Sequence, residues 1–179
     1  VILCGVIDIN GSYLNADGIG LENWEKEFEK NSSKMELEQV QEEILTHSGK
    51  RVFVDCTASQ AVASLYEGFL ENGVHVVTPN KKANSAELKL YQELQKLSNE
   101  AGFYYETNVG AGLPVISTIQ SLVNAGEKVT KVEMIASGTL SYIFNTWSED
   151  QKFSEIVKQA KELGYTEPDP RDDLGGVDV

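Results

Sequence analysis

Short apolar runs rich in β-branched residues alternate with longer amphipathic stretches along the first part of the chain. The apolar runs predict strands and the amphipathic stretches predict helices, because the two kinds of element bury their side chains with different periods. The predicted strands are VILCGVID, RVFVDCT, VHVVT and FYYETNV, at 1–8, 51–57, 74–78 and 103–109. The predicted helices are Leu21–Lys30, Met35–Thr46, Gln60–Glu71 and Ser85–Glu100.

Residues that favour helix ends support these boundaries. Asn72 and Gly73 end the third helix, and Gly102 closes the fourth. Asn84 is the expected N-cap of the fourth helix, because Glu87 follows at the spacing of a capping box. Strands and helices that alternate in this way are typical of α/β proteins with a parallel, doubly wound sheet.

Parallel sheets of this kind bind ligands at the carboxyl ends of their strands. The residues that directly follow the predicted strands are therefore the first candidates for a site. They are Asp8, Thr57–Ser59, Pro79–Lys82 and Asn108–Gly112.

The pattern changes after Pro114 and predicts a second region of α+β character. An apolar helix at Val115–Asn124 precedes KVTKVEMIAS (128–137), whose alternation predicts a strand. Two more helices are predicted at Leu140–Trp147 and Phe153–Leu163, and Gly164 ends the second of them.

Charge and hydropathy narrow the classes of partner. The formal net charge of −13 disfavours nucleic acid and anionic membrane surfaces, both of which attract basic patches. No apolar run approaches the length of about 20 residues that a transmembrane helix needs. The first residues, VILCGVIDIN, have no basic segment or cleavage site of a signal peptide. They begin inside an apolar run, so we expect a further strand and turn upstream.

The cysteines and histidines do not predict a metal centre. Cys4 and Cys56 lie in separate strand-like runs without metal-type spacing, which indicates two free thiols in a reducing, cytoplasmic compartment. His47 and His75 are isolated in the sequence, which argues against a zinc site.

Asp8 has two interpretations. An acid at the end of an early strand binds the ribose 2′-hydroxyl in dinucleotide folds, but the glycine-rich turn that normally precedes it is absent here. Asp8 also precedes Asn10 and Gly11, which is typical of a turn.

Polar residues follow the second and third strands. Thr57 and Ser59 lie between a strand and a helix, where they favour either a polar ligand or ordinary capping by Ser59. Asn80, Lys81 and Lys82 follow the third strand, where two lysines suit a cofactor or a carboxylate substrate, or form a solvated pair.

Two glycine-containing turns are further candidates. Gly110 and Gly112 allow close backbone approach to a ligand, or turn carbonyls toward a cation. Gly138, Thr139 and Ser141 begin a helix after a predicted strand, which suits a polar ligand or helix capping.

The last residues form an acidic loop stiffened by prolines. Carboxylates in such a loop can hold an ammonium group, tune a proton donor, or be merely solvated. A calcium loop does not fit, because the sixth position from Asp169 is Leu174 where glycine is needed. The acids are Glu167, Asp169, Asp172, Asp173 and Asp178.

Taken together, five motifs resemble homoserine dehydrogenase in their order and spacing. They are VDCTASQAVA, HVVTPNKKAN, ETNVGAGLPVI, SGTLSYIFN and GYTEPDPRDDLGGVDV. The resemblance extends over the whole chain, and GIGLENWEKEF is most similar to the fused aspartokinase–homoserine dehydrogenases. It implies an incomplete Rossmann-type NAD(P)-binding domain at 1–113 and the start of a catalytic and dimerisation domain at 114–179.

The resemblance also implies a reaction and a role for each matching position. The family interconverts aspartate 4-semialdehyde and homoserine with NAD or NADP, in threonine and methionine biosynthesis. The implied cofactor-binding positions are Thr57, Lys81 and Gly164, beside the candidates Asp8, Ser59 and Asn80. The implied substrate positions are Gly138, Thr139, Glu167 and Asp173. The implied site for a monovalent cation such as sodium is Glu106, Val109, Ala111 and Leu113.

The catalytic positions implied by the resemblance are Asp178 and Lys81. The family continues GVDV with an Ala-Arg-Lys stretch whose lysine donates the proton, so we expect these 179 residues alone to be inactive. An acid at Asp8 repels a 2′-phosphate, which favours NAD over NADP. The resemblance implies a small-molecule substrate, a homo-oligomer and, from the fused relatives, an aspartokinase domain. Another amino-acid oxidoreductase and a non-catalytic nucleotide-binding or dimerisation module remain alternatives.

Overall fold

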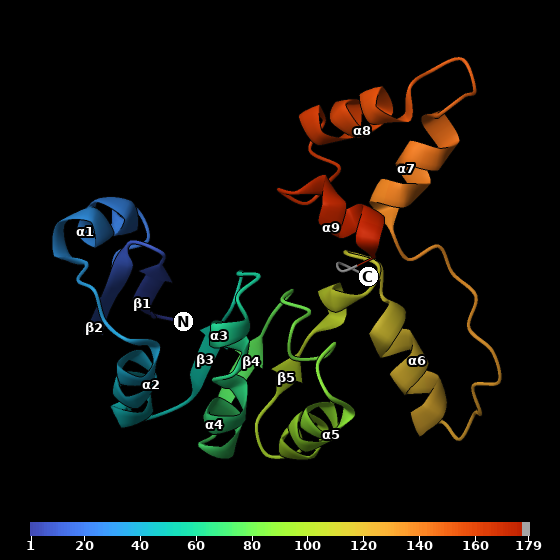
Figure 1. Cartoon of the computed structure of the whole chain (residues 1–179). Coiled ribbons are helices and arrows are strands. Elements are labelled where there is room, and N and C mark those ends of the chain that lie inside the picture. The colour runs from blue at the N-terminus through green and yellow to red at the C-terminus, as the bar shows by residue number, and fades with distance from the viewer. Residues whose placement is uncertain (177–179) are drawn as a thin grey trace. The chain divides into compact units, whose positions relative to one another are not determined.

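The computed structural model describes residues 1–176, and these divide into two compact units. The first unit is Val1–Tyr105, and the second is Glu106–Val179. Figure 1 shows strands in the first unit and helices in both. Within the described residues, every helix is too short or too polar to cross a lipid bilayer.

A parallel sheet forms the centre of the first unit, which confirms the predicted α/β class. Its strands are β3 (Arg51–Val54), β4 (Val74–Val77) and β5 (Phe103–Tyr104), in the order β3-β4-β5. Both neighbouring pairs run parallel, with Val54 beside Val77 and Val77 beside Tyr104. All three strands therefore end at the same edge.

One face of this sheet is packed and the other is exposed. Helices α4 (Tyr66–Glu71) and α5 (Leu88–Leu97) lie on the packed face, where the ring of Phe53 stacks on that of Phe69 at 4.6 Å between centroids. The exposed face carries apolar side chains that are register partners or lie two residues apart. They are Val52, Val54, Val77 and Tyr104.

The predicted first strand exists, but its partner differs from the expected parallel sheet. β1 (Leu3–Asp8) pairs antiparallel with β2 (Gly11–Ile19), a strand that the pattern did not predict. The polar Asp8–Gly11 turn closes this hairpin. Gly11 is needed there, because a Cβ would lie 2.8 Å from the carbonyl oxygen of Ser33.

The helices of the first unit lie where they were predicted, but they are shorter than predicted. α1 is Trp24–Asn31 and α2 is Leu37–Thr46. The third predicted helix splits into α3 (Gln60–Ala63) and α4, which ends at Asn72 and Gly73 as predicted. The predicted cap at Asn84 is wrong, because α5 has Glu87 at its N-cap and Ser85 belongs to the preceding turn, bonded to Lys81 O.

The second unit is helical over its described residues. η1 is a short 3-10 helix at Glu106–Asn108, so the fourth predicted strand stops earlier than expected. The helices are α6 (Val115–Asn124), α7 (Gly138–Thr146), α8 (Phe153–Glu162) and α9 (Pro170–Gly175). Ile143 of α7 packs with Ile156 and Ala160 of α8 in a small core.

The predicted strand at 128–137 is wrong. This segment has no strand or helix, and its apolar side chains at Val132, Met134 and Ile135 are exposed. A strand needs neighbouring backbone partners, and the described part of the second unit offers no strand to pair with.

Candidate functional site

The loops that follow β3 and β4 lie side by side, because their strands are parallel neighbours. The ladder continues one step past the strands, where Asp55 N donates to Val77 O at 3.0 Å and Thr78 N donates to Tyr104 O at 2.9 Å. Backbone hydrogen bonds therefore join the loops along the sheet edge where the sequence predicts a ligand site.

A buried polar cluster joins these two loops, and we call it the Asp55 cluster. It consists of Asp55, Tyr66, Thr78 and Asn80, all less than 4% exposed. Asn80 Nδ2 donates to Asp55 Oδ2 at 2.9 Å, and the Tyr66 hydroxyl hydrogen-bonds to the same oxygen. The Tyr66 hydroxyl also lies 2.9 Å from Thr78 Oγ1, which accepts from Asn80 N at 2.8 Å. Side chains from the loop after β3, from α4 and from the loop after β4 are thus connected.

Tyr66 is neutral in this environment. Burial raises the pKa of Tyr66 above its usual value, and the neighbouring Asp55 carboxylate raises it further. A phenol has one proton and a carboxylate has none, so Tyr66 donates to Asp55 and accepts from the Thr78 hydroxyl.

Thr57 and Ser59 shape the loop after β3. Thr57 N donates to Asp55 Oδ1 at 2.7 Å, and Ser59 N donates to Thr57 Oγ1 at 3.1 Å. Ser59 Oγ accepts from Val62 N at 3.3 Å, which confirms the capping interpretation of Ser59. Thr57 is exposed at the sheet edge.

In the loop after β4, Asn80 is buried, whereas Lys81 and Lys82 are partly exposed. The Asn80 side chain faces the interior, where it donates to Asp55 and to Ser59 O at 3.0 Å. Lys81 and Lys82 are half-buried at the edge, and Lys82 N donates to Asn80 Oδ1 at 3.1 Å. Asn80 therefore fixes the loop that carries the two lysines.

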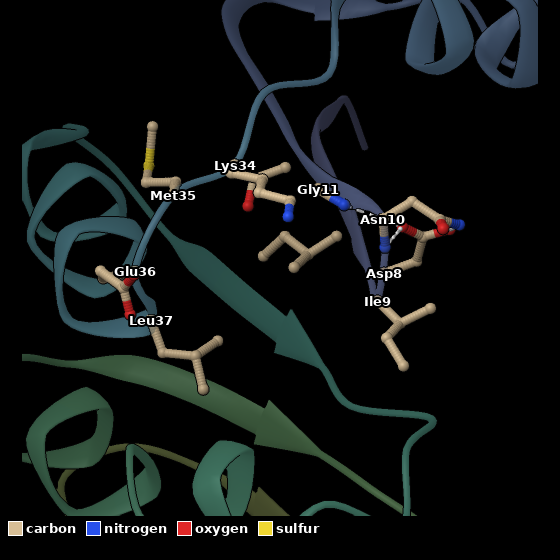
Figure 2. Close-up of a pocket in the computed structure, with 10 residues that line it drawn as sticks. Asp8, Ile9, Asn10, Gly11, Lys34, Met35, Glu36 and Leu37 are labelled. Atoms are coloured by element: carbon tan, nitrogen blue, oxygen red, sulfur yellow. Dashed lines mark hydrogen bonds between the residues drawn. The ribbon is translucent and has the colours of Figure 1, made fainter.

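Asp8 lies at the tip of the β1–β2 hairpin and forms the turn that the sequence suggested. Its Oδ1 accepts from Asn10 N at 2.6 Å and from Gly11 N at 3.1 Å (Figure 2). Desolvation raises the pKa of Asp8, but the hydrogen bonds from Asn10 and Gly11 outweigh it and lower the pKa below its usual value. Asp8 borders an open pocket of about 220 Å³ that also includes Lys34 and Leu37.

The predicted cation-binding turn has unusual backbone geometry. Ala111 has a φ of 49° and Gly110 a φ of 75°, so two successive residues are left-handed. Both Glu106 carboxylate oxygens accept from the start of α6, from Ile116 N and Ser117 N, each at 2.9 Å. Val109 and Leu113 complete the turn, where Leu113 N donates to Gly110 O at 3.0 Å.

The described residues do not gather enough carboxylate, imidazole or thiolate side chains at this turn to form a metal site. Among residues 1–176, no group of three or more His, Cys, Asp or Glu side chains could hold a metal ion. A site built from backbone carbonyls does not require such a group.

The predicted substrate residues Gly138 and Thr139 line an open pocket of about 350 Å³ with Tyr142 and Tyr165. The Thr139 hydroxyl donates to Tyr165 O, and the two tyrosine rings meet edge to face at 4.9 Å. The start of α7 is therefore held against the residue that follows Gly164, whose φ of 75° ends α8 as predicted.

The acidic loop contains one buried carboxylate. Asp173 is 1% exposed and its Oδ2 accepts from Glu167 N at 2.9 Å, while the Glu167 side chain is exposed. Asp169 caps α9 and pairs with Arg171, whose hydrogen bonds lower the Asp169 pKa to about 2. The predicted catalytic Asp178 lies outside the described residues.

Sequence reasoning missed three members of the Asp55 cluster: Asp55, Tyr66 and Thr78. A signal for Asp55 and Thr78 existed, because each directly follows a predicted apolar strand core at the ligand-binding edge. Tyr66 gave no such signal, since it lies within a helix and becomes part of the cluster only through packing.

Comparison with protein families assigns both parts of the chain. The family model described as homoserine dehydrogenase, NAD binding domain, matches residues 2–108. The family model described as homoserine dehydrogenase matches residues 114–179.

Individual relatives agree. The chain is 45% identical to a bifunctional aspartokinase/homoserine dehydrogenase of Haemophilus influenzae over 180 residues, which cover 99% of this chain and 22% of the relative. It is 44% identical to a homoserine dehydrogenase of Schizosaccharomyces pombe, covering 97% of this chain and 49% of the relative. The chain therefore spans about half or less of the length of these relatives.

A solved structure has a similar fold. A hyperthermophilic archaeal homoserine dehydrogenase in complex with NADPH matches with a TM-score of 0.75 and 25% identity, covering 98% of this chain and 56% of the other. Together with the family matches, this shows that the chain belongs to the homoserine dehydrogenase family and that its first part is the family's NAD-binding domain.

Proposed function

We propose that this chain is part of an enzyme that interconverts L-aspartate 4-semialdehyde and L-homoserine with NAD or NADP. The observation that carries the proposal is the edge of β3 and β4, where Thr57 and Lys81 lie on loops joined through Asp55 and Asn80. Membership of the homoserine dehydrogenase family supplies the reaction. This reaction belongs to threonine and methionine biosynthesis.

The residues at this edge fit a dinucleotide. Thr57 is exposed and Lys81 brings positive charge to a chain of net charge −13, so the edge suits the phosphates of the cofactor. When bound, the nicotinamide supplies or accepts the hydride. In this proposal Thr57 and Lys81 bind and orient it, while Ser59 and Asn80 hold the loops that carry them.

The second unit supplies the substrate-binding residues in this proposal. Gly138 and Thr139 border the pocket that receives the amino acid. The exposed Glu167 carboxylate attracts its ammonium group, and the buried Asp173 holds the Glu167 backbone in place. Asp178 assists the proton donor, a lysine in the family.

Two finer assignments concern the cofactor and an ion. Asp8 disfavours the 2′-phosphate of NADP by charge, so we propose that NAD is preferred. We also propose that Val109, Ala111 and Leu113 hold a monovalent cation such as sodium through their carbonyl oxygens. Glu106 then fixes this turn against the start of α6 and adds negative charge beside the ion.

The relatives suggest the wider assembly. The Haemophilus influenzae relative is named as bifunctional with aspartokinase, and we propose that this chain also belongs to a fused protein. We propose further that the enzyme is a homo-oligomer, because the family's catalytic region also forms dimers.

An activity assay on the full-length protein, as its gene encodes it, tests these proposals. NAD(P)H consumption is followed with aspartate 4-semialdehyde, for the wild type, Lys81→Met and the control Lys89→Met, an exposed lysine of α5. Lys81→Met should lower kcat/KM about tenfold to a hundredfold, since it removes a charged hydrogen bond. Lys89→Met should not change it.

Each outcome bears on one assignment. Absence of semialdehyde-dependent turnover in the wild type would refute the proposed function, and unchanged kcat/KM in Lys81→Met would refute the role of Lys81. A higher kcat/KM with NADPH than with NADH would refute the argument from Asp8. Activity that does not respond to removal of sodium would refute the cation site.

A further inference from the structure

We propose that Asp55 is a positioning residue that sets the geometry of the dinucleotide-binding edge. This inference rests on the proposed function, because it concerns the same loops. It assigns to the buried Asp55 cluster the task of holding Thr57 and Lys81 in the arrangement that the cofactor requires.

Asp55 joins three parts of the fold through its two oxygens. Oδ1 accepts from Thr57 N in its own loop at 2.7 Å. Oδ2 accepts from Asn80 Nδ2 in the β4 loop at 2.9 Å and from the Tyr66 hydroxyl of α4. A single carboxylate thus fixes the position of both loops relative to each other and to the helix behind them.

The β4 loop is held through further bonds of Asn80. Its Nδ2 also donates to Ser59 O at 3.0 Å, and its Oδ1 accepts from Lys82 N at 3.1 Å. Lys81, which lies between Asn80 and Lys82, is therefore anchored on both sides. A shift of Asp55 would reach Lys81 through Asn80, which directly precedes Lys81 in the same loop.

The electrostatics support positioning over simple stabilisation. Asp55 is 2% exposed, and Thr57 N, the Tyr66 hydroxyl and Asn80 Nδ2, which donate to it, are neutral groups. Burial of a carboxylate is costly even when it accepts hydrogen bonds, so an apolar core would hold the sheet together at a lower cost in free energy. What an apolar residue cannot do is fix three donors from separate segments at defined distances.

This arrangement prepares the edge for binding before the cofactor arrives. Ordering a loop during binding costs free energy, and a loop that is already ordered avoids that cost. Loosening the cluster should therefore weaken binding of the dinucleotide more than binding of the amino-acid substrate.

Two substitutions and a matched control test the inference in the naturally encoded protein. Asp55→Asn turns an amide N–H group toward a donor in either rotamer, and Tyr66→Phe removes only the hydroxyl. The control is Tyr105→Phe, which removes another buried phenol hydroxyl, one that donates to Gln95 Oε1 at 3.2 Å. The measurements are the Kd for NADH and NADPH, the KM for aspartate 4-semialdehyde and the Tm of each variant.

We expect Asp55→Asn to raise the dinucleotide Kd roughly tenfold or more, and Tyr66→Phe about threefold to tenfold. Tyr105→Phe should stay within about twofold of the wild type. The semialdehyde KM, measured at saturating cofactor, should change less than the dinucleotide Kd. In the double variant, Tyr66→Phe should add less than it does alone, because both changes disrupt one network.

The inference is overturned if Tyr66→Phe lowers Tm but binds the dinucleotide as tightly as the control does. That comparison also decides the matter if Asp55→Asn does not fold. A wild type that binds NADH or NADPH but never turns over the semialdehyde refutes the proposed function alone, and the Kd comparison still tests Asp55. A wild type that binds neither cofactor refutes both.

Discussion

The segments VHVVT in the first unit and KVTKVEMIAS in the second have similar patterns and different structures. Both alternate and contain β-branched residues, and both predict a strand. VHVVT forms β4, between two parallel neighbours, with Val74 and Val76 fully buried. KVTKVEMIAS pairs with no strand of the described residues and leaves Ile135 80% exposed. The pattern states which side chains favour burial, but a strand also needs backbone partners that lie far away in the sequence.

The largest expected effect comes from removing a buried side chain that packs against the sheet of the first unit, compared with an exposed one in the 128–137 segment. Phe69→Ala should lower the free energy of unfolding by about 3–5 kcal/mol, because Phe69 is fully buried and stacks on Phe53. Ile135→Ala should change it by less than about 0.5 kcal/mol, because Ile135 is exposed. Urea denaturation of both variants measures the difference. A cost at Ile135 equal to that at Phe69 would show that the 128–137 segment is packed after all.

A loss of stability of intermediate size is expected equally in both units, because helix capping depends on local hydrogen bonds rather than on distant partners. Ser59 caps α3 and Ser137 caps α7 with similar bonds, of 3.3 Å to Val62 N and 3.0 Å to Leu140 N. Ser59→Ala and Ser137→Ala should each lower the free energy of unfolding by about 1 kcal/mol, since each leaves a helix N–H without its acceptor. Replacement by threonine is the control and should retain most of the stability. A much larger loss at one site would show that capping is not its main role.

The smallest effect is a pH dependence in the acidic loop. The pKa of Asp169 is lowered to about 2 from 3.8 by its bonds with Arg171. A lowered folded-state pKa stabilises the fold above the unfolded value, and this contribution is lost as pH falls from about 4 to about 2. Arg171→Gln should therefore flatten the dependence of Tm on pH in that window. An unchanged slope would mean that the exposed pair contributes nothing to stability.

The fold was predictable where local signals were sufficient. The positions of β3, β4 and β5, helix α2 and the helix ends at Asn72 and Gly164 follow from side-chain periodicity and backbone preferences. The β1–β2 hairpin was missed, because GSYLNADGI carries too few apolar residues to signal a strand. The N-cap of α5 was also missed, because a turn bonded to Lys81 O occupies the first residues of the predicted helix.

The candidate site was predictable in its place and less so in its internal structure. The expectation that residues after β3 and β4 share one edge depends only on parallel pairing, and the pairing is observed. Asn80 and Lys81 are equal candidates when only their position after the strand is known. Only packing shows that the Asn80 side chain faces inward toward Asp55 and that Tyr66 reaches the same carboxylate from α4.

The sequence by itself determined the family, the α/β class of the first unit and the edge of the sheet where chemistry is expected. These properties depend on motifs and periodicity, which are local in the chain. The tertiary structure decided which polar side chains face the interior, which apolar segment becomes a strand, and that Asp55 joins the two loops. Contacts between residues far apart in sequence determine these features, since burial and hydrogen bonding depend on neighbours that only the folded chain brings together.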